Sequence, residues 1–174
     1  MIWPTADDSN YREVVGLELL KDVLDLMLTE SVREKLGDSY GVGLQSVNSS
    51  AYEGFGYIAA SAVVAPDRAD VVEKAFAEAA AELRDKPIPA DLLDRARNPE
   101  LEAVDRAFKD NGYWVAALSQ AQTRPERLER IRTRRTVRES ITAAELQELA
   151  RRYLQPGTAR TARIVSSKLE TAAR

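Results

Sequence analysis

The sequence predicts an α+β fold: a two-layer sandwich with helices on one face of a mainly antiparallel or mixed sheet. Apolar residues recur at helical spacing over long stretches, while two shorter stretches alternate with the period of two that is typical of strands. Pro and Gly residues separate the two kinds of stretch. The chain has 174 residues, a length in the usual range for one domain, so we expect a single domain over residues 1–174.

The chain is expected to begin with a strand that leads into a long, buried helix. Residues 2–5 contain good strand formers, and the run Asp7-Asp8-Ser9-Asn10 offers N-caps for the helix that follows, with the paired acids Asp7 and Asp8 interpreted as capping residues. From Val14 to Val32, apolar residues repeat every three or four positions with further apolar residues beside them. This pattern predicts a helix that is buried on more than one side, with Gly37 at its C-terminal end.

A hairpin and a series of helices are expected next. The period changes to two at Tyr40, and a second extended run covers residues 55–65, which predicts an antiparallel hairpin with at least one buried strand. Helices are predicted from Pro66 to before Pro87, from 90 to about 108 with a kink at Pro99, over 113–121, from 125 to about 138, and from the capping box of Thr142 and Glu145 to Leu154. Residues 161–166 are predicted to form a last strand, and residues 168–174 a frayed tail.

Histidine and cysteine are both absent from the chain. Most catalytic zinc sites use imidazole ligands, and most serine or cysteine nucleophiles are activated by imidazole. We therefore expect no metal site and no imidazole-assisted active centre in this chain, while chemistry based on carboxylates alone or on lysine stays open. No apolar run is long enough to span a membrane. A net charge of -3 argues against a protein built chiefly to bind nucleic acid.

An arginine-rich segment allows an alternative. Seven arginines and three glutamates lie within residues 124–139, and Arg-rich helices can bind the phosphates of nucleic acids. The arginines spread round the helix, however, and no aromatic residue lies between them. A solvated face with ion pairs inside the helix is the favoured interpretation. Trp114, next to Tyr113, is expected in the core.

The segment from Ser31 to Val42 contains the most specific pattern in the chain. Arg33-Glu34-Lys35 closes the predicted helix, and Tyr40-Gly41-Val42 opens the next strand. The pattern resembles the Arg-Glu-Lys and Tyr-x-Val pattern of the C-terminal, non-zinc-binding half-domain of the pitrilysin/insulinase family of zinc metallopeptidases. Less specific similarities lie at Trp3-Pro4-Thr5, Ala96-Arg97-Asn98, Asn111-Gly112-Tyr113-Trp114 and residues 142–156, so the resemblance covers nearly the whole chain.

In that family two related halves close like a clam shell. The N-terminal half binds zinc through His-x-x-Glu-His and a distant Glu, and the C-terminal half lends an Arg and a Tyr to the substrate. Arg33 and Tyr40 match these two residues by position, which implies that they hold the peptide and stabilise the oxyanion. Without the resemblance, Arg33 would be explained by the helix dipole or a pair with Glu30, and Tyr40 by packing.

The resemblance thus implies a non-catalytic, substrate-binding half of a zinc metalloendopeptidase. Its expected partners are a peptide, bound by addition to a sheet edge, and a zinc-binding N-terminal half or paired subunit; no nucleic acid is expected. The extended start of the chain favours a domain cut from a longer chain. The alternative function is an assembly scaffold of the same fold without a peptidase role. The resemblance favours the bacterial periplasm over the cytoplasm.

Overall fold

The computed structural model describes residues 1–36, 41–119 and 121–165, and within residues 32–36 it describes the backbone alone. Gly37, Tyr40, Ser166 and the predicted tail at 168–174 lie outside these ranges. No helix in the described part of the chain is long and apolar enough to cross a membrane.

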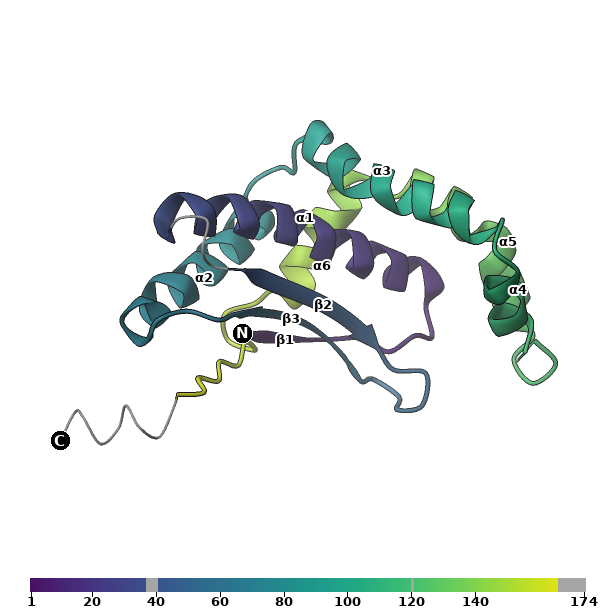
Figure 1. Ribbon diagram of the computed structural model, residues 1–174, viewed down its shortest axis with the longest axis horizontal. Helices are drawn as coiled ribbons and strands as arrows, with labels where there is room; N and C mark the ends of the chain where they lie inside the picture. The colour runs from purple at the N-terminus through teal and green to yellow at the C-terminus, as the bar shows by residue number, and fades with distance from the viewer. Residues whose placement is uncertain (37–40, 120, 166–174) are drawn as a thin grey trace.

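An antiparallel sheet forms one layer of the molecule, and helices cover one of its faces (Figure 1). Its described strands are β1 (Ile2–Thr5), β2 (Val42–Asn48) and β3 (Gly56–Ala62), in the order β1-β3-β2. Trp3 lies opposite Ile58, and both side chains are buried under the helices. The predicted hairpin is confirmed, because β2 and β3 pair in antiparallel register with Leu44 opposite Ala60.

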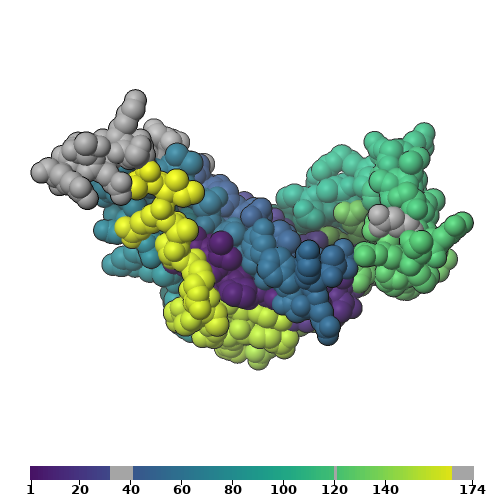
Figure 2. Space-filling view, turned by 90° about the horizontal axis from the view of Figure 1, so that it is seen from below, coloured from purple at the N-terminus to yellow at the C-terminus, as the bar shows by residue number. Residues whose placement is uncertain are grey.

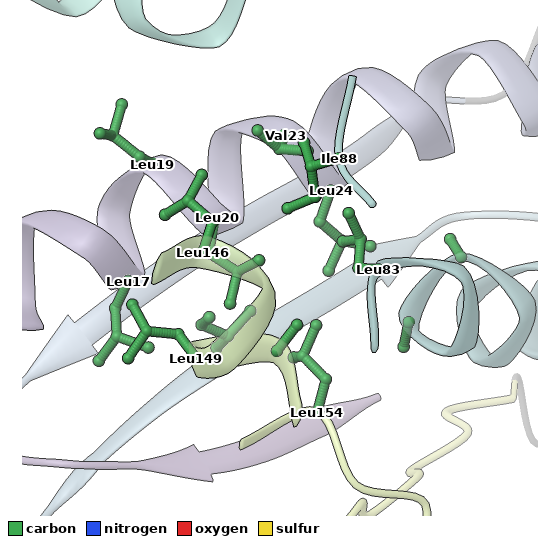
Figure 3. Packing of buried hydrophobic residues seen from close by; sticks show 14 of the residues in the cluster. Leu17, Leu19, Leu20, Val23, Leu24, Leu83, Ile88, Leu146, Leu149 and Leu154 are labelled. Carbon is green, nitrogen blue, oxygen red and sulfur yellow. The ribbon is translucent and has the colours of Figure 1, made fainter. Parts of the chain in front are cut away.

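The helix α1 (Tyr11–Leu36) lies over the sheet and forms the centre of the core (Figure 3). Several of its side chains have no exposed surface: Val15, Leu17, Leu19, Leu20, Val23, Leu24 and Leu28. These positions extend round the helix, which contacts β2, α2, α3, α5 and α6. The expectation of a helix buried on more than one side is confirmed.

The other helices form two groups. After the short turn η1 (Pro66–Arg68), α2 (Ala69–Asp85) and α6 (Ala143–Tyr153) pack beside α1. A lobe at one end of the molecule consists of α3 (Ala90–Ala107), α4 (Asn111–Leu118) and α5 (Glu126–Ser140) (Figure 1). The helix α3 continues across Pro99. The capping box before α6 is confirmed, because Thr142 accepts from Glu145 N and donates its own N–H to the Glu145 carboxylate.

The prediction that Asp7 and Asp8 cap α1 is wrong. Asn10 is the capping residue, since its Oδ1 accepts from the N–H of Glu13 at 3.2 Å. Asp7 instead accepts from the N–H of Gly54 in the β2–β3 loop at 2.6 Å. Asp8 pairs with Arg130 of α5 at 3.2 Å. Both acids lie too far before α1 to meet the free N–H groups of its first turn.

The predicted strand at residues 161–166 is not formed in its described part, 161–165. Arg160 makes a single antiparallel bridge to Ile2, with backbone hydrogen bonds of 2.7 and 2.9 Å. Beyond this bridge, the described residues 161–165 form no further pairing with β1.

Trp114 is not in the core. Its side chain is 36 % exposed, stacks on Phe108 with ring centroids 5.6 Å apart, and donates from Nε1 to the carbonyl of Phe108 at 2.9 Å. The helix α4 packs mainly against α5, at the edge of the lobe, so its apolar side chains are only partly covered. The helical pattern indicated an apolar residue but not how little of the fold would cover it.

Only some of the arginines of α5 lie on a solvated face and form ion pairs within the helix. Arg132 pairs with Glu129 inside the helix at 3.8 Å, as predicted. Arg138, by contrast, is buried and pairs with Glu18 of α1 and with Glu100 of α3, the latter at 3.6 Å. Because α5 packs against both α1 and α3, this arginine connects the three helices inside the molecule.

Gly56 provides a test of the sheet register. A Cβ at this position would lie 2.0 Å from the carbonyl oxygen of Ala6 and 2.8 Å from that of Val47, so backbone would have to move. We expect Gly56→Ala to lower the free energy of unfolding by about 2–3 kcal/mol, measured by urea denaturation. Gly157→Ala is the control, since nothing lies within 4 Å of its Cβ position. Equal stabilities of the two variants would contradict this register.

Candidate functional site

The predicted site residues lie where α1 ends and β2 begins. Arg33 is in the last turn of α1, and Tyr40 is two positions before Val42, the first residue of β2. The side chain of Arg33 and the whole of Tyr40 lie outside the described residues. The helix and strand that flank them pack against each other, and the end of α1 and the start of β2 lie at the same end of the molecule (Figure 1).

The strand β2 has a free edge within the described part of the chain. Ala60 of β3 exchanges two backbone hydrogen bonds with Met1, at 2.8 and 2.9 Å, so its N–H and C=O groups point toward the β1 side. Leu44, the partner of Ala60 in β2, is therefore in a non-hydrogen-bonded pair. By the same alternation, the N–H and C=O groups of Val42, Leu44 and Ser46 point outward from the free edge.

The two edges of the sheet differ in their protection. On the β1 side, Ile2 is bridged to Arg160, and Pro4 has no N–H to offer. The strand β2, Val-Gly-Leu-Gln-Ser-Val-Asn, contains no proline and no charged residue. Stable proteins usually block an edge with such residues, with a bulge, or with a covering segment. The β2 edge is thus the one that is suited to pair with a further strand.

Aromatic side chains lie beside this edge on the face of the sheet that the helices leave open. Tyr57 of β3 is opposite Val47, and its ring meets that of Phe55 edge-on at 6.1 Å. Phe55 in turn meets Tyr52 of the β2–β3 loop at 6.3 Å. Gln45 donates to the Tyr57 hydroxyl at 3.5 Å. A strand added to β2 would have an apolar surface to one side of it.

Carboxylates occupy the face of α1 that leads to Arg33. Residues 18, 22, 25 and 33 recur at helical spacing, and burial raises the pKa of Glu18, Asp22 and Asp25. Attraction to Arg138 opposes this rise at Glu18. Asp22 pairs with Lys21, but its Oδ2 is buried and has no hydrogen-bond partner. None of these carboxylates was a predicted site residue, although their spacing is visible in the sequence.

The residues present do not fit a zinc site. The chain has no histidine or cysteine, and in the part that the structure describes no three potential ligands converge on one point. The α1 carboxylates are held instead by Lys21 and Arg138.

Comparison with known proteins supplies a family. The model of the Peptidase M16 inactive domain matches residues 1–99. No curated protein matches the chain. Among solved structures, the inactive peptidase domain of a protein from Bordetella parapertussis classed as a zinc protease is similar with a TM-score of 0.76. The match covers 94% of this chain and 89% of that one, at 19% sequence identity.

Two longer proteins contain a similar fold. An M16-like peptidase from Alicyclobacillus acidocaldarius gives a TM-score of 0.64 at 18% identity, over 90% of this chain and 38% of that one. The ferredoxin protease FusC, solved in complex with Arabidopsis ferredoxin, gives 0.66 at 18% identity, over 86% of this chain and 17% of that one. At these identities the similarities show the fold alone.

Asp22 provides a test of the buried carboxylates. Its raised pKa in the folded state means that its ionisation costs stability as pH rises from about the ordinary value of 3.8 through the raised value. Asparagine has no such cost. We expect the stability of Asp22→Asn relative to the parent chain, from urea denaturation, to be greater at pH 7 than at pH 3.5. The exposed Asp91→Asn is the control, and the same pH dependence in both variants would refute the burial explanation.

Proposed function

Because the chain belongs to the family of M16 peptidase inactive domains, we propose that it is the substrate-binding half of a pitrilysin-like zinc metalloendopeptidase. An inactive domain of this family works with a catalytic half, which in our proposal supplies the zinc. The single observation that carries the proposal is the unprotected β2 edge, which begins beside the helix end that contains Arg33.

The peptide is proposed to bind as an added strand along β2. The outward N–H and C=O groups of Val42, Leu44 and Ser46 would exchange hydrogen bonds with its main chain. In recognition of this kind, main-chain hydrogen bonds supply the affinity and pockets for alternate side chains supply the specificity. Side chains of the bound peptide would alternate between the aromatic face at Tyr57 and the side of α1.

Arg33 and Tyr40 are proposed to contact the peptide at the start of this strand. A guanidinium and a phenol both donate hydrogen bonds, so they can hold a peptide carbonyl and stabilise the negative charge that develops on it. Such donors contribute about 3–4 kcal/mol to transition-state binding where water is excluded. The C-terminal end of α1 also favours a cation at position 33.

A scaffold function is the second candidate, and one surface favours it. Trp114, Val115 and Leu118 of α4 are exposed large apolar side chains on the lobe. Apolar side chains that gather on a surface are typical of contacts between proteins. A scaffold would need this surface but not Arg33 or Tyr40, so activity measurements separate the two functions.

Cleavage by the combined halves tests the roles of the two residues. We expect this chain, mixed with its zinc-bearing half, to support peptide cleavage. Arg33→Ala should lower kcat/KM by about 100-fold, and Tyr40→Phe by about tenfold or more, because each removes a donor to the oxyanion. Glu30→Ala is the control for a pair inside the helix. Normal turnover by both variants, with assembly intact, would favour the scaffold.

A second prediction tests the β2 edge. Ser46→Pro removes an outward N–H without removing a bond of the β2–β3 ladder, which is the position where an edge strand tolerates proline. We expect it to raise KM for the peptide by about tenfold, since a backbone hydrogen bond and the local register are lost. Ser46→Ala keeps the N–H and should leave KM unchanged. If the proline variant binds peptide normally, the peptide does not pair with this edge.

A further inference from the structure

A pocket of about 350 Å³ lies between the lobe and the start of α1. Four arginines and two tyrosines lie in its wall: Arg124, Arg127, Arg130, Arg134, Tyr11 and Tyr113. Among the described residues of the wall the acids are Asp8 and Glu126, so these residues carry a charge of +2 (4 minus 2). This is opposite in sign to the net charge of -3 of the whole chain.

Arg124 and Arg134 form no ion pair within 4 Å of a described carboxylate, although the charge of Arg134 opposes the rise that burial causes in the pKa of Glu18. Arg130 is neutralised, since it binds the carboxylate of Asp8 at 3.2 Å and its carbonyl at 2.6 Å. Within the described part of the chain, Arg124 donates to the carbonyl of Ser50 at 3.3 Å. The guanidinium of Arg134 lies 5.6 Å from the ring centroid of Tyr113 and forms no ion pair with any described carboxylate. Arg124 and Arg134 therefore each bring to the pocket a positive charge that forms no ion pair with a described carboxylate.

The pocket is held in shape by its neighbours. The guanidinium of Arg130 lies over the ring of Tyr11 at 5.5 Å, which connects α5 to the start of α1. One turn beyond Arg134, the buried Arg138 fixes α5 to Glu18 and Glu100. A guanidinium whose position is already restricted loses less entropy when it binds a ligand.

We propose that this arginine pocket, defined by Arg124, Arg134, Tyr11 and Tyr113, binds a carboxylate of an acidic polypeptide. The planar guanidinium matches the planar carboxylate and can bind it through two parallel hydrogen bonds. The volume suits one or two side chains. The acids in the wall disfavour a phosphodiester backbone. An arginine already lies over one face of each tyrosine ring, which reduces the ring surface on which a base could stack.

The pocket lies at the far end of β2 from Arg33. Arg124 binds Ser50, two residues after the end of β2, and the β2–β3 loop approaches the lobe in Figure 2. The strand from Val42 to Asn48 is about 20 Å long at the usual rise per residue. This inference rests on the proposed function, in which the peptide lies along β2. The peptide residue that carries the carboxylate would then follow the peptide residue bound by Arg33 by roughly six to nine positions, which places it near the pocket.

Fluorescence anisotropy with a peptide series tests the proposal. The reference peptide is a neutral ten-residue sequence with an amidated C-terminus. Two variants carry one Glu or one Gln near one end, and a third is the neutral sequence with a free C-terminal carboxylate. We expect the Glu or free-carboxylate peptide to bind about tenfold more tightly than its neutral counterpart; the pair that differs identifies the source of the carboxylate. No preference in either pair would overturn the proposal.

The variants locate the effect. Arg134→Gln should abolish the preference and leave the neutral peptide unaffected, while Arg134→Lys, which keeps the charge but not the planar fork, should retain part of it. Arg132→Gln, on the same helix and with a side chain 75% exposed, should change nothing. A preference that survives Arg134→Gln, or is lost equally in Arg132→Gln, would overturn the pocket assignment, as would stronger competition by inorganic phosphate or an oligonucleotide.

The same data separate this inference from the proposed function. Loss of binding of all peptides on Arg33→Ala or Ser46→Pro, with the preference for acidic peptides still sensitive to Arg134, supports both. In a second outcome, the preference for acidic peptides depends on Arg134, but Arg33→Ala and Ser46→Pro do not change the affinity for any peptide. This outcome supports the pocket and contradicts binding along β2.

Discussion

Burial of α1 is the constraint on which the rest of the structure depends. Its fully buried side chains extend round the helix, and a sheet can cover only one side of a cylinder. The remaining sides are covered by α2, α3, α5 and α6, all of which contact α1. With the helices gathered round α1, the opposite face of the sheet is left open, and the free edge of β2 adjoins that face. The geometry of the candidate site thus follows from the packing of one helix.

The lobe is attached in a different way. It meets the body through α3 and α5, and its charged contacts include Arg130 with Asp8 and the buried Arg138 with Glu18. An ion pair of this kind defines one orientation more sharply than apolar surface does, because each bond has a direction. Removal of one partner would leave a buried charge unpaired. The same arginine-rich helix forms a wall of the pocket, so attachment and recognition share one element.

Features with local signals were predictable from the sequence. The helix that ends before Pro87, the capping box at Thr142 and the β2–β3 hairpin all depend on residues close together in the chain. What failed depends on distant partners. Arg138 meets Glu18 from 120 residues away, and Asp8 meets Arg130 from 122 away, which no local pattern encodes. The roles of Arg33 and Tyr40 came from a family motif, and they remain predictions that physical reasoning on the residues alone would not have singled out.

The open edge of β2 favours self-association of the chain in solution. An edge that can accept a peptide can equally accept the same edge of another copy, since both offer the same row of unpaired backbone groups. The absence of proline and charge from β2 removes the usual barrier to such self-association. The same seven residues of β2 must therefore stay open for peptide binding and yet avoid pairing with another copy. A partner half or a bound peptide that covers the edge would prevent this self-association.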